Sequence, residues 1–242
     1  MATIEELRFG PFVGQLARPE TSSAEPRPGV LVMADALGIG DFSVGQAAKL
    51  ADLGFVALAG DIYGGGFRAV DAAGVAEKGA MLSDHGAIRA NVRSNMDALA
   101  AVEGVDPSRL AAIGYCMGGT AVLELARSGY ACCAVVSFHG VLGTSFPAGR
   151  GDVVASVLVC TGADDPYAPL EEVLAFQAEM TAAEADSQVL IYSGTQHSWT
   201  NPDSYTEWPG IAYHPKNAER SWVAMLDFVG EAFGAERTGV GA

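Results

Sequence analysis

The stretch AIGYCMGGTA, residues 112–121, places a cysteine among glycines where an apolar run gives way to a helix-forming segment. Gly114, Cys116 and Gly118 form the pattern G-x-C-x-G, a nucleophile elbow in which sulfur replaces the usual serine oxygen. The strand-to-helix turn of such an elbow is sharp, so the positions two residues before and after the nucleophile must lack side chains. At the first turn of a helix, unpaired amides and the positive dipole end favour a thiolate. The pattern therefore predicts that Cys116 projects into a cleft as a nucleophile.

Taken alone the pattern is weak, because the chain has 30 glycines and buried cysteines are usually inert hydrophobes. Its surroundings strengthen it. Continuous apolar runs rich in Val, Ile and Leu are typical of buried parallel strands, and they cover residues 29–35, 54–61, 109–115, 131–138, 153–162 and 188–194. Helical periodicity lies between them, at residues 43–52, 84–103, 118–128, 169–184 and 215–233.

This alternation predicts an α/β fold with a mostly parallel central sheet flanked by helices on both faces. The segment LRFGPFVGQLARP, residues 7–19, is expected to add an antiparallel edge strand or hairpin. We find no linker and no internal repeat, so one domain over residues 1–242 is expected. Two long connections, residues 61–82 and 198–214, are expected beyond the carboxyl ends of strands, where open α/β sheets bind their ligands.

Composition excludes several classes of function. The 242-residue chain is half hydrophobic and has a formal net charge of −15, which disfavours nucleic acid and anionic membrane surfaces as partners. No stretch is long enough to cross a bilayer, and the first ten residues, MATIEELRFG, lack the basic and apolar regions of a secretory signal. We therefore expect a cytoplasmic protein. The four cysteines show neither zinc nor redox spacing, and no disulfide framework is expected.

An acid and a histidine follow the elbow in the chain order of α/β-hydrolases. The acid is expected just after a strand, where VLVCTGADDPYAP offers Asp164 and Asp165. The histidine is expected after the last strand, where QVLIYSGTQHSW supplies His197. Three other histidines fit less well: His85 and His214 begin predicted helices, and His139 ends a strand on the cleft side, where packing near the site is the simpler interpretation. Cys132, Cys133 and Cys160 lie in apolar runs and are expected in the core.

Read together, these residues resemble the dienelactone hydrolase family, whose hallmark is a G-Y-C-x-G-G elbow inside an α/β-hydrolase sheet. The segment GYCMGG matches it, and VLVMADALGIGD, GFVALAGDIYGGG, GADDPYAP, GTQHSWTNP and AYHPKNAERSW resemble further family blocks in order. The resemblance implies an α/β-hydrolase fold with Cys116 as nucleophile, His197 as general base and acid, and Asp165 as the residue that orients the imidazole. It implies that Asp164 is a solvent-exposed charge of the same loop.

The same resemblance implies that the backbone amides of Ala36 and Met117 form the oxyanion hole. It places a thiol-activating acid at Asp35, where the family has a glutamate with one more methylene. The arginines that hold the carboxylate of the family's dienelactone substrate correspond to Gly65 and Asn201, so this anion clamp is absent. Arg68 could replace it as a substrate-binding cation, or it could be a surface arginine of a loop.

The function expected from these features is cysteine-dependent hydrolysis of a small ester or lactone through an acyl-thioenzyme, without metal or organic cofactor. Trp199 and Tyr63, aromatic residues of the two long connections, are candidate substrate contacts. Two alternatives remain at this stage: a non-hydrolytic thiol redox or ligand-sensing protein, and a binding module that keeps the triad as a relic. The sequence leaves open whether the protein is a monomer or a homodimer.

Overall fold

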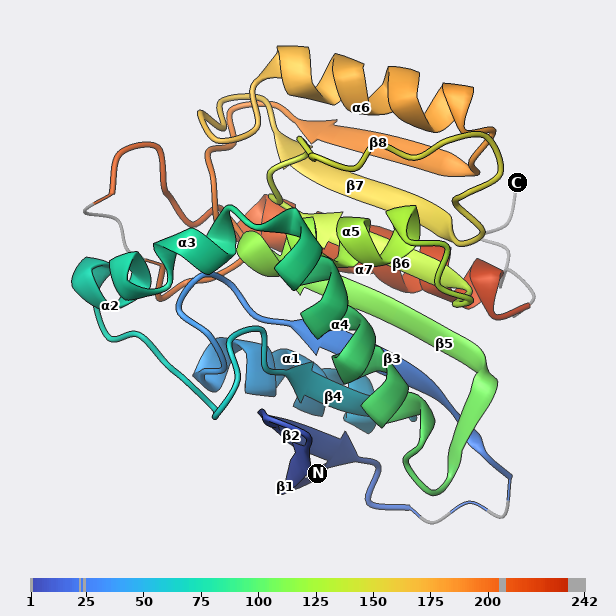
Figure 1. Cartoon of the computed structure of the whole chain (residues 1–242). Helices are drawn as coiled ribbons and strands as arrows, with labels where there is room; N and C mark the ends of the chain where they lie inside the picture. Colours follow the sequence, from blue (N-terminus) through green and yellow to red (C-terminus); the bar gives the residue numbers. More distant parts are fainter. Residues whose placement is uncertain (1, 22, 24, 205–207, 235–242) are drawn as a thin grey trace.

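The computed structural model describes residues 2–21, 23, 25–204 and 208–234 and contains one eight-stranded sheet (Figure 1). Its strand order is β1-β2-β4-β3-β5-β6-β7-β8. The strands are β1 (Thr3–Phe9), β2 (Phe12–Arg18), β3 (Arg27–Met33), β4 (Val56–Gly60), β5 (Val105–Tyr115), β6 (Ala134–Phe138), β7 (Ser156–Gly162) and β8 (Ser187–Tyr192). The helices are α1 (Asp41–Asp52), α2 (Ala72–Glu77), α3 (Gly79–Leu82), α4 (His85–Ala100), α5 (Met117–Arg127), α6 (Leu170–Ala182) and α7 (Pro215–Ala232).

The sheet is mostly parallel, as the continuous apolar runs predict. The N-terminal hairpin of β1 and β2 is antiparallel and joins the sheet through antiparallel pairing of β2 with β4, while the pairs from β4–β3 to β7–β8 are parallel. This is the architecture of an α/β-hydrolase with an antiparallel N-terminal edge, and it confirms the predicted fold class.

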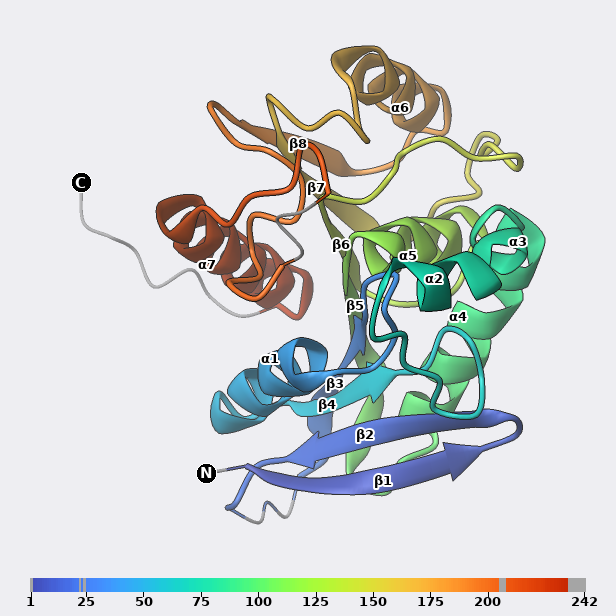
Figure 2. The ribbon, with the colours of Figure 1, turned by 90° about the vertical axis from the view of Figure 1, so that its left-hand side faces the viewer.

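Helices cover both faces of the sheet. Figure 2 shows α1 and α7 on one face, with α4 and α5 on the other. Successive residues of a strand point to opposite faces, so Val30 and Val32 pack with α1 and α7, whereas Leu31 and Met33 pack with α4 and α5. Both faces of the central strands are therefore buried, which is why their sequences are apolar throughout rather than alternating.

Edges and connections differ from the sequence expectation. β8 is a partly exposed edge strand, and its consecutive residues Leu190 and Ile191 are open to solvent. The connection expected over residues 61–82 contains the short helices α2 and α3. In the part of the chain that the structure describes, no helix combines the length and the apolar character needed to cross a lipid bilayer.

Candidate active site

The elbow joins β5 to α5 at Cys116. Cys116 has φ 53° and ψ −117°, a backbone conformation that is rare for a residue with a side chain. The glycines around it allow the close approach of backbone: a Cβ on Gly114 would overlap the carbonyl of Gly118, and one on Gly118 would overlap the carbonyl oxygens of Met33 and Ala34. The third glycine, Gly119, would bring a Cβ to 2.7 Å from the Ser137 hydroxyl oxygen. These contacts hold the partly exposed Cys116 at the N-terminus of α5.

The packing of Gly118 on the end of β3 also places two backbone amides beside Cys116. Met117 begins α5, and Ala36 lies in the turn after β3 and lines the same pocket as Cys116. Among the described residues neither amide has a hydrogen-bond acceptor. The hydroxyl of Tyr63 donates to the Ala36 carbonyl oxygen at 2.6 Å and so fixes this turn. Tyr63, expected as a substrate contact, is not among the residues that line the pocket.

His197 and Asp165 meet in a buried pair. Nδ1 of His197 lies 2.8 Å from Oδ2 of Asp165, and the other carboxylate oxygen accepts the Tyr167 amide at 2.8 Å. The backbone of His197 is anchored by its amide, which donates to the Gly210 carbonyl, and by its carbonyl, which accepts from the Ala212 amide. Asp164, the other candidate acid, is exposed.

The environment of His197 favours its charged form. Burial lowers the pKa of His197, but the negative charge of Cys116 and hydrogen bonds to Asp165 and Cys116 outweigh burial and raise the pKa to about 10. At neutral pH the imidazole is therefore protonated, and it lies beside the Cys116 sulfur. A sulfur nucleophile beside a proton donor is the arrangement needed for attack on a carbonyl and for protonation of a leaving group.

Asp35 lines the pocket, but its carboxylate is bound to its own loop. Oδ1 accepts the Leu37 amide at 2.9 Å, and no hydrogen bond joins Asp35 to the Cys116 sulfur within the described residues. Burial raises the pKa of Asp35, although the Leu37 amide, Arg68 and His197 oppose this shift. The predicted thiol-activating acid thus lines the pocket without a hydrogen bond to the thiol among the described residues.

The pocket around Cys116 has a volume of about 200 Å³ and mostly apolar walls. The walls are formed by Asp35, Ala36, Leu37, Cys116, Val141, Tyr167, His197, Ser198, Asn201, Ser204, Trp208 and Ile211. Asn201, one of the two positions that lack the family's arginine, is among them. Arg68 lies outside this wall, in a neighbouring hollow that shares Asp35, and its side chain is 3.8 Å from Asp41.

Trp199 was expected to form a pocket wall, and this expectation is wrong. Its side chain is 0% exposed and packs in the core against His139 and Tyr192. Ser198 has φ 56°, so the chain turns sharply between His197 and Trp199 and sends the indole away from the pocket. The tryptophan that lines the pocket is Trp208.

His139 supports the elbow more closely than its sequence position suggests. It is buried, its Nδ1 accepts the Cys116 amide at 3.0 Å, and its Nε2 lies 2.8 Å from the Thr200 hydroxyl oxygen. Burial and the charge of His197 hold the pKa of His139 well below its usual range, which keeps the ring neutral and able to accept. The only sequence signal was its place at the end of a strand on the cleft side.

The remaining histidines and cysteines lie apart from the pocket wall. His85 contacts Ser145, and the His214 side chain accepts the Asn217 amide at the start of α7. Cys132 and Cys160 are buried, and burial raises the pKa of each thiol to about 12. Cys133, expected in the core, is half-exposed because it lies just before β6, and its thiol contacts the Ser108 carbonyl.

Comparison with known proteins finds relatives that cover most of the chain. The solved structure of m3DLH has 37% sequence identity to this chain and a TM-score of 0.90, and the match covers 96% of this chain and 99% of m3DLH. The dienelactone hydrolase-like promiscuous phosphotriesterase P91 from metagenomic libraries has 38% identity, a TM-score of 0.89, and coverage of 96% and 98%.

Among curated sequences, a protein of Escherichia coli K12 named "Putative carboxymethylenebutenolidase" is 27% identical over 227 residues, which cover 88% of this chain and 79% of that protein. The model of the dienelactone hydrolase family matches residues 12–233, nearly the whole described chain. The chain therefore belongs to the dienelactone hydrolase family and has the fold of its hydrolases.

Proposed function

We propose that the protein hydrolyses small, neutral carboxylic esters or lactones with Cys116 as nucleophile, through an acyl-thioenzyme. The observation that carries this proposal is the partly exposed Cys116 at the start of α5, beside a His197–Asp165 pair in which Nδ1 and Oδ2 lie 2.8 Å apart. The names of similar proteins, a carboxymethylenebutenolidase and a dienelactone hydrolase-like phosphotriesterase, support an ester-hydrolysing activity.

In the first half of the reaction, the Cys116 thiolate attacks the carbonyl carbon and forms a C–S bond. The carbonyl oxygen becomes an oxyanion that accepts hydrogen bonds from the amides of Ala36 and Met117. As this intermediate collapses the C–O bond breaks, and Nε2 of His197 gives its proton to the leaving alkoxide. The product is an alcohol and a thioester on Cys116.

In the second half, His197 takes a proton from water, which attacks the thioester carbon. The C–S bond breaks, the carboxylic acid leaves, and the thiolate–imidazolium pair is restored. Asp165 holds Nδ1 of His197 so that Nε2 faces the sulfur in both halves. Every proton transfer uses groups of this chain and water.

The pocket favours a small uncharged acyl group. Its volume of about 200 Å³ lies below the usual range of ligand pockets, and the side chains of Leu37, Val141, Trp208 and Ile211 make its walls apolar. Arg68 is not part of its wall. We therefore expect weaker turnover of an anionic dienelactone than of a neutral ester of similar size.

The redox-sensor alternative receives less support. Such a sensor needs an accessible low-pKa thiol beside a resolving cysteine. The pKa values of Cys132 and Cys160 are raised to about 12, and neither these two thiols nor Cys133 line the Cys116 pocket.

The test compares hydrolysis of p-nitrophenyl acetate by the wild type, Cys116→Ala and Cys133→Ala. We expect Cys116→Ala to abolish turnover and Cys133→Ala, a half-exposed thiol outside the pocket, to retain it. His197→Gln should slow deacylation, so that mass spectrometry detects an acetyl group on Cys116. An aryl phosphate triester belongs in the same panel because P91 is described as a phosphotriesterase. Full turnover by Cys116→Ala would refute the proposal.

A further inference from the structure

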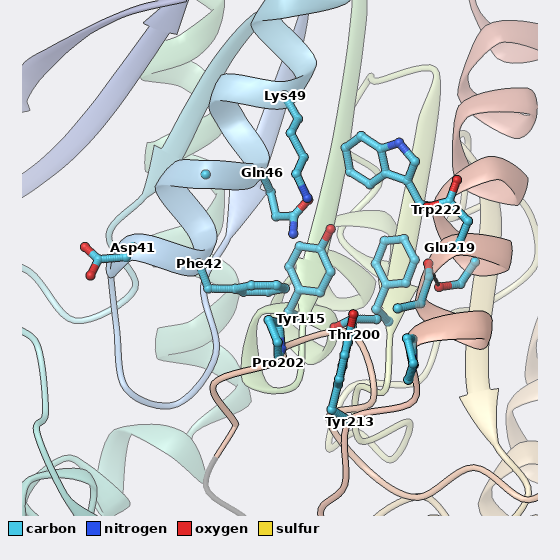
Figure 3. A pocket seen from close by; sticks show the side chains of 15 residues that line it. Asp41, Phe42, Gln46, Lys49, Tyr115, Thr200, Pro202, Tyr213, Glu219 and Trp222 are labelled. Atoms are coloured by element: carbon cyan, nitrogen blue, oxygen red, sulfur yellow. Dashed lines mark hydrogen bonds between the residues drawn. The ribbon is translucent and has the colours of Figure 1, made fainter.

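A second cavity, larger than the catalytic pocket, lies between α1 and α7 on the opposite side of the elbow strand (Figure 3). Its volume is about 480 Å³, within the usual range of ligand pockets. It shares no wall residue with the catalytic pocket within the described chain. Its floor is formed by Tyr115 at the end of β5 and Phe138 at the end of β6, each the residue directly before an active-site residue.

The walls of this cavity are rich in aromatic rings. Tyr115 stacks on Phe138 with ring centroids 4.8 Å apart and an interplanar angle of 9°, and Phe42 meets Tyr115 edge-on at 4.9 Å. Trp222 closes the α7 side. Flat rings on several sides suit a planar aromatic ligand, because offset stacking and edge-to-face contacts add to apolar burial.

Three polar side chains point into the cavity, and one of their atoms, Oε1 of Gln46, is buried without a hydrogen-bond partner among the described residues. Figure 3 shows Gln46 and Lys49 from α1 and the hydroxyl of Tyr115 directed toward the same space. Tyr115 is 2% exposed and Gln46 is 7% exposed, so both polar groups are nearly shielded from bulk water. Burial raises the pKa of Tyr115, so its hydroxyl stays protonated and able to donate.

Lys49 adds a positive charge at this cluster of donors. Its ammonium lies 5.7 Å from the centroid of the Trp222 ring and forms no ion pair within the described chain. Two acids also line the cavity: Asp41 is fully exposed, points away in Figure 3 and lies 3.8 Å from Arg68, and Glu219 is an exposed residue of α7. The buried part of the cavity thus presents the Gln46 amide and the Tyr115 hydroxyl, and the exposed Lys49 adds one cation.

We propose that this cavity is a binding site for a small aromatic carboxylate. The ring would lie among Phe42, Tyr115 and Trp222, and the carboxylate would accept from Lys49, Gln46 and the Tyr115 hydroxyl. The Lys49 ammonium, the Gln46 amide nitrogen and the Tyr115 hydroxyl can all donate to a carboxylate, which offers four lone-pair positions. Binding at this site does not depend on the proposed hydrolytic activity.

The site is connected to the nucleophile by two short paths. Tyr115 directly precedes Cys116 in the chain. Thr200, in the cavity wall, is hydrogen-bonded to His139, which in turn accepts a hydrogen bond from the Cys116 amide. A bound carboxylate is therefore placed to change the elbow without occupying the substrate pocket, and any effect on turnover should not be competitive with the ester.

The test is isothermal titration of the full chain with 2-naphthoate. We expect one site, with affinity about fivefold weaker in Lys49→Met, because solvent screens the exposed ammonium of Lys49, and about tenfold weaker in Tyr115→Phe. Lys78→Met is the matched control, because Lys78 also lies over an aromatic ring, that of Phe67 at 4.4 Å, outside the cavity wall. Its affinity should equal that of the wild type.

Three further measurements can overturn the proposal. Alkylation of Cys116 with iodoacetamide should leave the affinity unchanged, and its loss would place the ligand in the catalytic pocket. The neutral 2-naphthylmethanol should bind about tenfold more weakly, and equal affinity would remove the role of the three donors. Tighter binding of the cationic 2-naphthylmethylamine, or absence of naphthoate binding at millimolar concentration, would refute the site.

Discussion

Replacing Asp165 by asparagine is the sharpest test of the proposed mechanism. Oδ1 of Asp165 accepts the Tyr167 amide and Oδ2 faces Nδ1 of His197, both at 2.8 Å. An asparagine has one acceptor and one donor group at these positions. Because the backbone amide can only donate, the new side-chain oxygen must face Tyr167, and the NH₂ group then faces His197.

That orientation forces the wrong tautomer on His197. Nδ1 must accept from the NH₂ group, so the neutral ring carries its proton on Nε2 and cannot take one there from water. A lost hydrogen bond to a charged group costs about 1.5–3 kcal/mol, which is about 10- to 150-fold in rate. Since the tautomer is also inverted, we expect kcat to fall by at least about 100-fold.

The assay is steady-state hydrolysis of p-nitrophenyl acetate, with Asp164→Asn as the matched control. Asp164 is the adjacent residue, is exposed and undergoes the same chemical change, so its kcat should remain within about twofold of the wild type. Thermal unfolding of both variants checks that they fold. An Asp165→Asn enzyme within threefold of wild-type kcat, or an equal loss in Asp164→Asn, would refute the reasoning.

Three more predictions follow from the site. For an alkyl ester, whose leaving group needs a proton, kcat/KM should persist as pH rises above 8 and decline through about pH 10, because the raised pKa keeps His197 protonated until then; a decline near pH 7 would contradict this. In Cys116→Ala, the pKa of His197 measured by NMR should drop below 10, since the charge that raises it most is removed; an unchanged value would show that the thiolate does not contribute. Gly118→Ala should unfold the elbow or cost more than about 3 kcal/mol of unfolding free energy, because its Cβ would overlap the Met33 and Ala34 carbonyls. The control is Gly45→Ala in α1, which should not destabilise the protein because the space around its Cβ is open. Equal melting temperatures for the two variants would refute the packing argument.

The sequence predicted the sheet well because buried parallel strands are continuous apolar runs. It could not show which strand lies at an edge, so the half-exposed pattern of β8 appears only in the structure. The start of β5 was also missed: Val105 and Asp106 extend it, beyond a register shift between Pro28 and Gly29, and no local pattern encodes that pairing.

The order of motifs likewise identified the residues that meet at the pocket, since Cys116, Asp165 and His197 each follow a strand at the same end of the sheet. The sequence did not show in which direction a side chain points after a sharp turn. Trp199 is two residues from His197, yet the positive φ of Ser198 turns it into the core. The hydrogen bond from the Cys116 amide to His139 forms only because β5 and β6 are adjacent in the sheet, so no local sequence pattern predicts it.

The close packing of Gly118 against the carbonyls that end β3 has a consequence for how such an enzyme can diversify. The backbone of the segment that carries Met117 packs directly on the backbone of the segment that carries Ala36, with no side chain between them. Substitutions at Val141, Trp208 or Ile211 can then reshape what enters the pocket while the spacing of those two amides stays constant. Substrate range can thus drift under selection, natural or in the laboratory, without the reactive centre having to be rebuilt.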